Sequence, residues 1–207
     1  MIDPSALPAL HASHGGIWLR EADRTQAVAK GTAIARTAET PTLLLNAPLT
    51  GQRLGYPELN GLDLLELWAF VHPARFLVPT PKGLAEALGL TPAAGEADIP
   101  GLLQAAAKTL LDMLDTPGWR EREGGWTAAQ SLHRLRWTWA PLVTPRIARP
   151  AEAERWLFSK LPEWEETSAR AQPRPVVLTE TETLDRLSAI GRTPDRPRSP
   201  GRWDKWL

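Results

Sequence analysis

The sequence contains no cysteine, which excludes disulfide bonds, thiolate metal sites and cysteine nucleophiles from its 207 residues. The lack of disulfides fits a reducing compartment. No basic segment followed by an apolar run marks a secretory signal at the N-terminus. No stretch approaches the roughly 20 apolar residues that span a bilayer. We therefore expect a cytoplasmic protein without a membrane segment.

The sequence also lacks an excess of charge of either sign, because 24 Lys and Arg residues balance 24 Asp and Glu residues. A protein that coats DNA is normally strongly basic, so this balance argues against that class while leaving room for a local basic face. Twenty prolines are about twice the usual share. They predict many short elements, because proline interrupts helices.

Motifs for nucleotides and metals are missing as well. No string fits the G-x-x-x-x-G-K-[ST] loop, and Gly15-Gly16 lacks the third glycine of a dinucleotide fingerprint. His11 and His14 have no nearby Asp, Glu or Cys to complete a metal site, and we interpret them as polar residues at the end of a strand. We expect neither a cofactor nor a bound metal in this chain.

The hydrophobic pattern predicts strands first and helices later. Extended segments are expected at residues 8–13 and in a hairpin that joins residues 17–20 to 26–29. The short apolar run at residues 42–45 suits a strand buried on both faces. Helices are expected at residues 32–40 with Thr32 as N-cap, 62–72, 81–88 with Gly89 as the stop, 99–114, 127–136, 151–161 and 182–190.

This order of elements predicts an α/β fold with a helical C-terminal extension. We place the α/β domain at residues 1–116 and the extension at residues 117–190. Residues 191–207 are rich in Arg, Pro and Gly, so we expect a disordered tail there.

Asp63 and Glu66 are three residues apart and could share one face of a helix. Paired carboxylates hold Mg²⁺ or act as acid and base. Two acids that flank leucines on an amphipathic helix are more often a solvated edge, which is the interpretation we favour. Together with His72 they are the candidates for the alternative of an active metal-dependent nuclease or hydrolase with unfamiliar ligands.

Tryptophan is the residue in excess, with ten copies. Aromatic and arginine side chains bind unpaired bases. We therefore expect nucleic-acid or partner contacts at Trp137, Trp139, Arg146, Arg149 and Trp156. The other interpretation, which we favour for the rings, is that they fill a helical core or dock on a partner domain, because Trp is enriched at interfaces.

Three segments are similar to the middle of a proofreading-type DEDD exonuclease domain. They are Leu44–Thr50 (LLNAPLT), Leu62–Leu67 (LDLLEL) and Gly83–Leu90 (GLAEALGL). In that family a strand carries a His-Asn…Phe-Asp motif, a helix that begins with Asp-Thr follows, and a short helix ends in a Leu-Gly-Leu or Leu-Gly-Ile turn. The resemblance implies a ribonuclease H-like fold, in which acids hold two metal ions for 3′-to-5′ cleavage.

The catalytic acids of that family have no counterparts here. In place of its Asp-x-Glu motif the chain has His11-Ala12-Ser13, and in place of His-Asn…Phe-Asp it has Leu45-Asn46 and Leu49-Thr50. The last motif falls near Ile99 and Gln104. Two-metal catalysis needs clustered carboxylates. We therefore predict a degenerate exonuclease-like domain without catalytic residues.

Residues 7–187 resemble the region before the motor of DinG-type ATP-dependent DNA helicases, through the phrases at residues 43–55, 70–75 and 156–165. The resemblance implies a non-catalytic N-terminal accessory domain. Its partners would be the helicase motor domains, which would lie beyond Leu207, and single-stranded DNA. A free-standing interaction domain with no DNA role is the remaining alternative, and the zero net charge supports it.

Overall fold

The computed structural model describes residues 4–59, 61–119 and 122–150. Seven α-helices are found in this part of the chain: α1 (Lys30–Glu39), α2 (Ala47–Leu54), α3 (Leu64–Val71), α4 (Pro81–Leu88), α5 (Ile99–Asp115), α6 (Arg122–Arg134) and α7 (Ala140–Val143). Short 3-10 helices lie at η1 (Pro4–Ala6), η2 (Glu96–Asp98) and η3 (Thr144–Arg146). The helices expected at residues 151–161 and 182–190, the expected tail and Trp156 lie outside the described residues.

The described strands form one five-stranded mixed sheet: β1 (Ala9–Ala12), β2 (Ile17–Glu21), β3 (Arg24–Ala27), β4 (Leu43–Leu44) and β5 (Leu62–Asp63). Their order across the sheet is β3-β2-β1-β4-β5. β2 pairs antiparallel with both of its neighbours, whereas β1, β4 and β5 pair in parallel. Within this sheet β2 alone therefore runs against the other strands. The mixed sheet and its helices confirm the expected α/β class.

β4 is the strand buried on both faces that the apolar run predicted. Leu43 and Leu44 have no exposed surface, and they belong to different clusters of the core. The neighbouring strand approaches closely at Gly61, where a Cβ atom would lie 2.6 Å from Leu44 Cδ1 and 2.9 Å from the Thr42 carbonyl oxygen. A glycine is needed there because any side chain would collide with β4.

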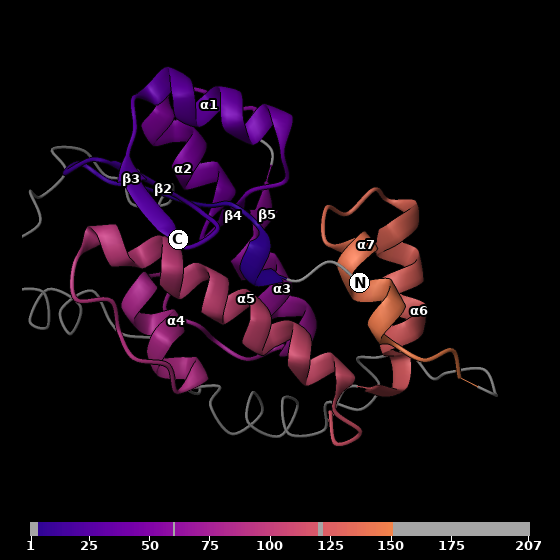
Figure 1. Ribbon diagram of the computed structural model, residues 1–207. Coiled ribbons are helices and arrows are strands. Elements are labelled where there is room, and N and C mark those ends of the chain that lie inside the picture. Colours follow the sequence, from indigo (N-terminus) through magenta and orange to yellow (C-terminus); the bar gives the residue numbers. More distant parts are fainter. Residues whose placement is uncertain (1–3, 60, 120–121, 151–207) are drawn as a thin grey trace, which may run out of the picture. The chain divides into compact units, whose positions relative to one another are not determined.

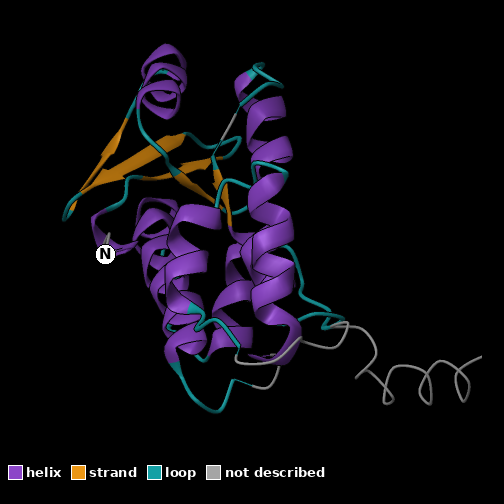
Figure 2. Ribbon diagram, turned by 90° about the vertical axis from the view of Figure 1, so that its right-hand side faces the viewer, coloured by secondary structure: helices purple, strands orange, loops and turns teal. Residues whose placement is uncertain are grey.

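Helices cover both faces of the sheet (Figure 1). On one face, residues of α1 and α2 form the smaller buried cluster with the strands: Leu10, Ala12, Leu19, Ala33, Leu44, Leu54 and Leu59. On the other face, Ala9, Leu43 and Leu62 contribute to the larger cluster, which includes residues of α3, α4 and α5. Figure 2 shows the strands between these two helical layers. Alternate residues of β1 thus enter different clusters, as the two-residue period of a strand requires.

Several helix boundaries agree with the sequence pattern. α3, α4 and α5 lie within two residues of the expected ranges. Gly89 ends α4 in the left-handed conformation (φ 65°), which an L side chain rarely adopts. The N-cap assigned to Thr32 is wrong, because α1 begins at Lys30 with Ala29 as its N-cap and no capping side chain.

α2 was not expected from the sequence. Asn46 caps it, and Pro48 lies in its first turn. An Asn followed by Pro at this spacing is a known start signal for a helix. The resemblance to the exonuclease family instead implies a strand motif over this segment.

The residues after 116 share the core of the α/β domain. Members of the larger cluster from this part of the chain are Trp119, Ala129, Trp139, Leu142, Val143 and Ile147. They lie in one cluster with Leu43 and Leu62 of the sheet. Residues 117–147 therefore complete the domain rather than build a second core. None of the described helices combines the length and apolar character needed to cross a membrane.

Candidate functional site

The carboxyl edge of the sheet is the first place to search for a site. The strand order reverses between β1 and β4, and open α/β sheets bind ligands beyond the carboxyl ends of their strands at such a point. His11-Ala12-Ser13 lies at this end of β1, and Asn46 follows β4. The exonuclease resemblance places the family's Asp-x-Glu motif at residues 11–13 and the acid of its Phe-Asp pair at Thr50, and it matches Asn46 to the Asn of the His-Asn pair.

Asn46 and Thr50 serve the start of α2. Asn46 Oδ1 accepts a hydrogen bond of 2.8 Å from the Leu49 backbone N–H. The buried Thr50 hydroxyl donates to the Asn46 carbonyl oxygen at 2.8 Å. The Asn46 side chain thereby satisfies one of the N–H groups that a helix start leaves unpaired. The Thr50 hydroxyl adds a second hydrogen bond to a carbonyl oxygen that already accepts from the Thr50 backbone N–H.

The end of β1 holds one histidine and one neighbouring acid. Burial lowers the pKa of His11; the charge of Glu96 opposes this shift and that of Arg53 adds to it. Hydrogen bonding with the Ser13 hydroxyl lowers the pKa of the exposed Glu96. Arg53 donates to the Ala12 carbonyl oxygen at 2.6 Å. A single carboxylate next to an arginine is a poor match for a divalent cation, which needs several oxygen ligands.

Gln104 bridges two distant segments. Its Oε1 accepts from Arg20 Nε at 2.7 Å, and its Nε2 donates to the Leu7 carbonyl oxygen at 2.8 Å. The side chain is buried, so both of its polar ends are satisfied inside the fold. Ile99 is the first residue of α5. No group of three or more His, Cys, Asp or Glu residues within the described ranges could hold a metal ion.

Asp63 fastens the starts of two helices. Its Oδ2 accepts from the Ala47 backbone N–H at 2.7 Å, and its Oδ1 accepts from the Leu65 backbone N–H at 2.8 Å. Asp63 is only 5% exposed. Burial raises the pKa of its carboxyl group, while the backbone hydrogen bonds oppose that rise. The interpretation as a solvated edge is therefore wrong for Asp63, because two helix N-termini compensate its charge.

Glu66 lies at the surface, as a solvated edge requires, but it is not free. Its Oε2 accepts a hydrogen bond of 2.9 Å from Trp137 Nε1. Partial burial raises the pKa of Glu66, the Trp137 hydrogen bond lowers it, and the charge of Asp63 raises it. Since both Asp63 oxygens already accept backbone N–H groups, the pair is arranged for structure rather than for chelation.

Three tryptophans that follow α5 in the chain donate their indole N–H groups to acceptors on and next to α3. Trp139 donates to the Asp63 carbonyl oxygen at 2.7 Å, Trp137 to Glu66 at 2.9 Å and Trp119 to the Val71 carbonyl oxygen at 3.0 Å. The Phe70 ring lies between, with its centroid 5.9 Å from that of Trp119 and 5.2 Å from that of Trp137. These contacts anchor residues 119–139 on α3.

The residues expected to contact nucleic acid or a partner have different environments. Trp139 has no exposed surface, so its ring fills the core and offers no face to a base. The Arg146 side chain is 6% exposed and pairs with Asp115. Trp137 is half-buried and Arg149 is exposed. Surface contacts are thus open to Trp137 and Arg149 but not to Trp139 or Arg146.

A cavity of about 310 Å³, which we call the edge pocket, lies beyond β4 and β5. Its lining comes from the start of α2, the loop before β5, α3 and the segment between α6 and α7: Ala47, Pro48, Pro57, Leu59, Gly61, Asp63, Glu66, Arg136, Trp137 and Thr138. Of these, the sequence indicated Asp63, Glu66 and Trp137. Arg136 and Thr138 carried no signal beyond their position beside Trp137.

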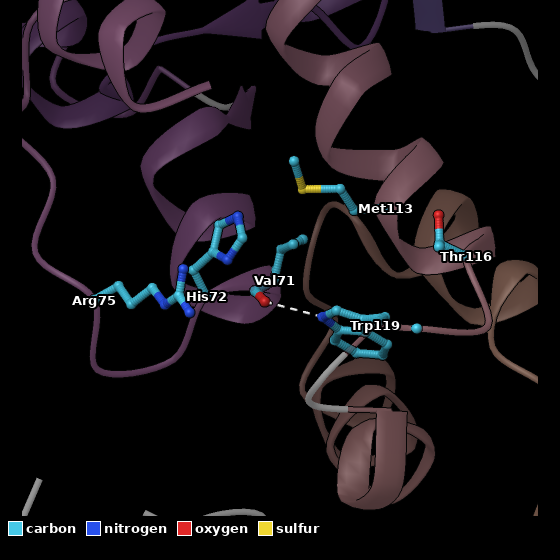
Figure 3. Close-up of a pocket in the computed structure, with 7 residues that line it drawn as sticks. Val71, His72, Arg75, Met113, Thr116 and Trp119 are labelled. Atoms are coloured by element: carbon cyan, nitrogen blue, oxygen red, sulfur yellow. Dashed lines mark hydrogen bonds between the residues drawn. The ribbon is translucent and has the colours of Figure 1, made fainter. Parts of the chain in front are cut away.

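A second cavity of about 220 Å³ lies between the end of α3 and the end of α5 (Figure 3). His72, the third candidate for the hydrolase alternative, lines it with Arg75, Met113 and Trp119. The His72 ring packs on Trp68, with 4.4 Å between the ring centroids. Burial lowers the pKa of His72, and the charge of Arg75 lowers it further. No acid lines this cavity, so His72 lacks a carboxylate partner there.

The lowered pKa of His72 predicts a loss of stability in acid. The unfolded chain takes up a proton near the ordinary value of 6.5, whereas the folded chain resists it, so stability present above that pH declines as the pH falls through it. We expect the variant His72→Gln to lose less of its urea midpoint between pH 7 and pH 5 than the parent protein does. The variant His133→Gln, at an exposed position, is the control and should lose as much as the parent. An equal loss in all three proteins would contradict the prediction.

Within the described residues, the fold and the edge pocket define a mixed α/β protein with a cavity of mixed polar and apolar lining at the carboxyl edge of its sheet. A scan against protein-family models and searches of curated proteins and of solved structures found no match to this chain.

Proposed function

We propose that the described residues form a degenerate ribonuclease H-like domain of the exonuclease type. The observation that carries this proposal is the strand order β3-β2-β1-β4-β5, with β2 alone antiparallel. Ribonuclease H-like sheets have this order and these directions. The segments similar to the exonuclease family also occupy suitable places, since Asn46 follows β4 and Asp63 precedes α3.

The proposed domain is non-catalytic. Two-metal hydrolysis needs several carboxylates around the ions, and the corresponding positions hold residues that stabilise the fold instead. The Thr50 hydroxyl donates to the Asn46 carbonyl oxygen in the first turn of α2, and Gln104 joins α5 to Leu7 and Arg20. Each replacement supplies hydrogen bonds to buried or terminal groups, which is how a fold persists after its reaction is lost.

We propose further that the domain is the N-terminal accessory part of a cytoplasmic DinG-type ATP-dependent DNA helicase. It would dock to the motor domains and guide a DNA strand, with no cofactor of its own. Exposed cations support strand guidance: Arg136 lines the edge pocket, Arg134 is the last residue of α6, and Arg149 follows η3. Exposed cations attract phosphates locally even when the net charge is zero.

Binding to single-stranded DNA tests this role. We expect the full chain to bind a labelled oligonucleotide with an affinity that weakens as salt rises, since phosphate contacts release counterions. The double variant Arg134→Gln, Arg149→Gln should reduce the slope of log affinity against log salt by about 0.7 per lost contact. Arg24→Gln, at an exposed position on the opposite edge strand, should leave it unchanged. Fluorescence anisotropy across a salt series measures these slopes.

The same samples, incubated with Mg²⁺ or Mn²⁺ and run on a gel, test the absence of catalysis. Intact DNA is expected. Trimmed DNA that depends on Asp63, Glu66 or His72 would instead support the alternative of an active nuclease. Absence of binding at every salt concentration would contradict strand guidance and favour a free-standing interaction domain.

A further inference from the structure

The edge pocket combines apolar walls with one aromatic ring. Pro48 lies in the first turn of α2, and Pro57 and Leu59 lie in the loop before β5. The half-buried Trp137 indole contributes the aromatic part of the lining and is held in place by its hydrogen bond to Glu66. Rigid apolar surfaces of this kind accept a flat ring, and proteins that bind single strands use them for bases.

Two polar atoms of the lining have unused hydrogen-bonding capacity. Thr138 Oγ1 is buried and has no partner among the described residues. Glu66 uses Oε2 for Trp137, and within the described chain its Oε1 accepts no hydrogen bond. Buried polar atoms are almost always paired, so an unpaired hydroxyl beside a cavity indicates that a ligand or water completes it. The Glu66 oxygen can accept and the Thr138 hydroxyl can donate, so together they suit a ligand edge that carries one donor and one acceptor.

The size and charge of the pocket restrict the ligand further. Its volume of about 310 Å³ is at the lower end of the range of about 300–1,000 Å³ for ligand sites, which suits one base or nucleoside. Arg136 is exposed, lines the pocket and makes no ion pair with a described residue. An exposed guanidinium beside a base-sized cavity is suitably placed for the phosphate of the same nucleotide.

We propose that the edge pocket binds one unpaired nucleotide whose base carries an exocyclic amino group, with cytosine as the smallest example. The amino group donates to Glu66, the Thr138 hydroxyl pairs with a ring acceptor, and Arg136 contacts the phosphate. Uracil places a carbonyl oxygen where cytosine has its amino group, so it meets the Glu66 carboxylate with like polarity and binds more weakly. This inference rests on the proposed role in guiding a DNA strand and names the nucleotide that the strand presents.

The indole N–H signal of Trp137 reports binding directly. We expect deoxycytidine monophosphate to shift this signal saturably in ¹H–¹⁵N spectra of the full chain, and deoxyuridine monophosphate to bind about tenfold more weakly, as for one base-edge hydrogen bond. The variant Trp137→Phe identifies the signal. In Glu66→Gln the amide oxygen still accepts from Trp137, but the ratio of the two affinities should fall to about one, because the amide offers both a donor and an acceptor.

The variant Glu86→Gln is the matched control, because Glu86 is an exposed acid on α4, and it should keep the tenfold ratio. No shift of the Trp137 signal with either nucleotide would overturn the inference, and so would equal affinities in the parent protein. Salt-dependent binding of an oligonucleotide together with either result would leave strand guidance intact while removing the edge pocket as its base site. A tenfold ratio that persists in Glu66→Gln would overturn the role of Glu66.

Discussion

Replacement of Trp139 by alanine is expected to lower the free energy of unfolding by about 3–5 kcal/mol, the usual loss for a large aromatic side chain in a core. Trp139 has no exposed surface, and its Nε1 donates to the Asp63 carbonyl oxygen at 2.7 Å. The alanine variant loses the packing of the ring and leaves that oxygen without its indole donor. Urea denaturation followed by circular dichroism measures the change.

The variant Trp139→Phe separates the two contributions. It keeps most of the ring volume but removes the N–H donor, so we expect a loss of about 1–3 kcal/mol, the cost of an unsatisfied buried acceptor. Leu135→Ala is the control, because Leu135 is 77% exposed and its truncation should change stability by less than about 0.5 kcal/mol. A Trp139→Ala protein as stable as the Leu135→Ala protein would show that the segment is not anchored on α3 through this ring.

Replacement of Asp63 by alanine is expected to lower the free energy of unfolding by about 2–3 kcal/mol. A hydrogen bond to a charged group contributes about 1.5–3 kcal/mol, and Asp63 accepts from the starts of both α2 and α3. The net stabilisation is smaller than the sum of two such bonds, because burial of the Asp63 carboxyl group opposes its ionisation. Urea denaturation at pH 7 tests the value.

The pH dependence of the Asp63 contribution has a definite sign. Its pKa in the folded protein is raised above the ordinary value of 3.8. The stability linked to this shift is therefore fully present below that value and declines as the pH rises through the raised pKa. The penalty of Asp63→Ala should accordingly be larger at pH 4 than at pH 7. The control is Asp112→Ala, which removes an exposed ion pair with Lys108 on α5 and should cost less than about 1 kcal/mol. An equal penalty for both variants would contradict the role of Asp63 in joining the starts of α2 and α3.

Trp139 and Asp63 belong to one structural unit. The carboxylate of Asp63 accepts hydrogen bonds from the starts of α2 and α3. The backbone carbonyl oxygen of Asp63 accepts a hydrogen bond from Trp139 Nε1, in the segment before α7. The edge pocket is lined by parts of the same unit. Loss of either residue should therefore weaken nucleotide binding in the pocket as well as stability, whereas Glu66→Gln should affect only the preference between bases.

Local patterns in the sequence predicted much of the fold. The short apolar run became β4, the leucine stripe became α5, and Gly89 ends α4. These features depend on residues within one or two turns of each other, so their signals are local. α2 was not predicted, although Asn46 and Pro48 mark its start, because the resemblance to the exonuclease family implies a strand motif in this segment.

The candidate site was predicted only in part. Asp63, Glu66 and Trp137 were singled out by residue type, but their roles depend on partners far away in the chain. Trp119, Trp137 and Trp139 donate to acceptors 48, 71 and 76 residues earlier. No periodicity or motif connects such positions, because the hydrogen bonds form only after the later segment has packed on α3.

The sequence by itself determined the α/β class, the core strand and the principal helices, since hydrophobic period and helix-stop residues act over short distances. Only the tertiary structure decided which tryptophans are buried and which lie beside the edge pocket. It also decided that Asp63 is a buried acid that joins the starts of α2 and α3, and not a solvated one. Burial and hydrogen-bond partners are properties of the packed chain, and residue type alone specifies neither.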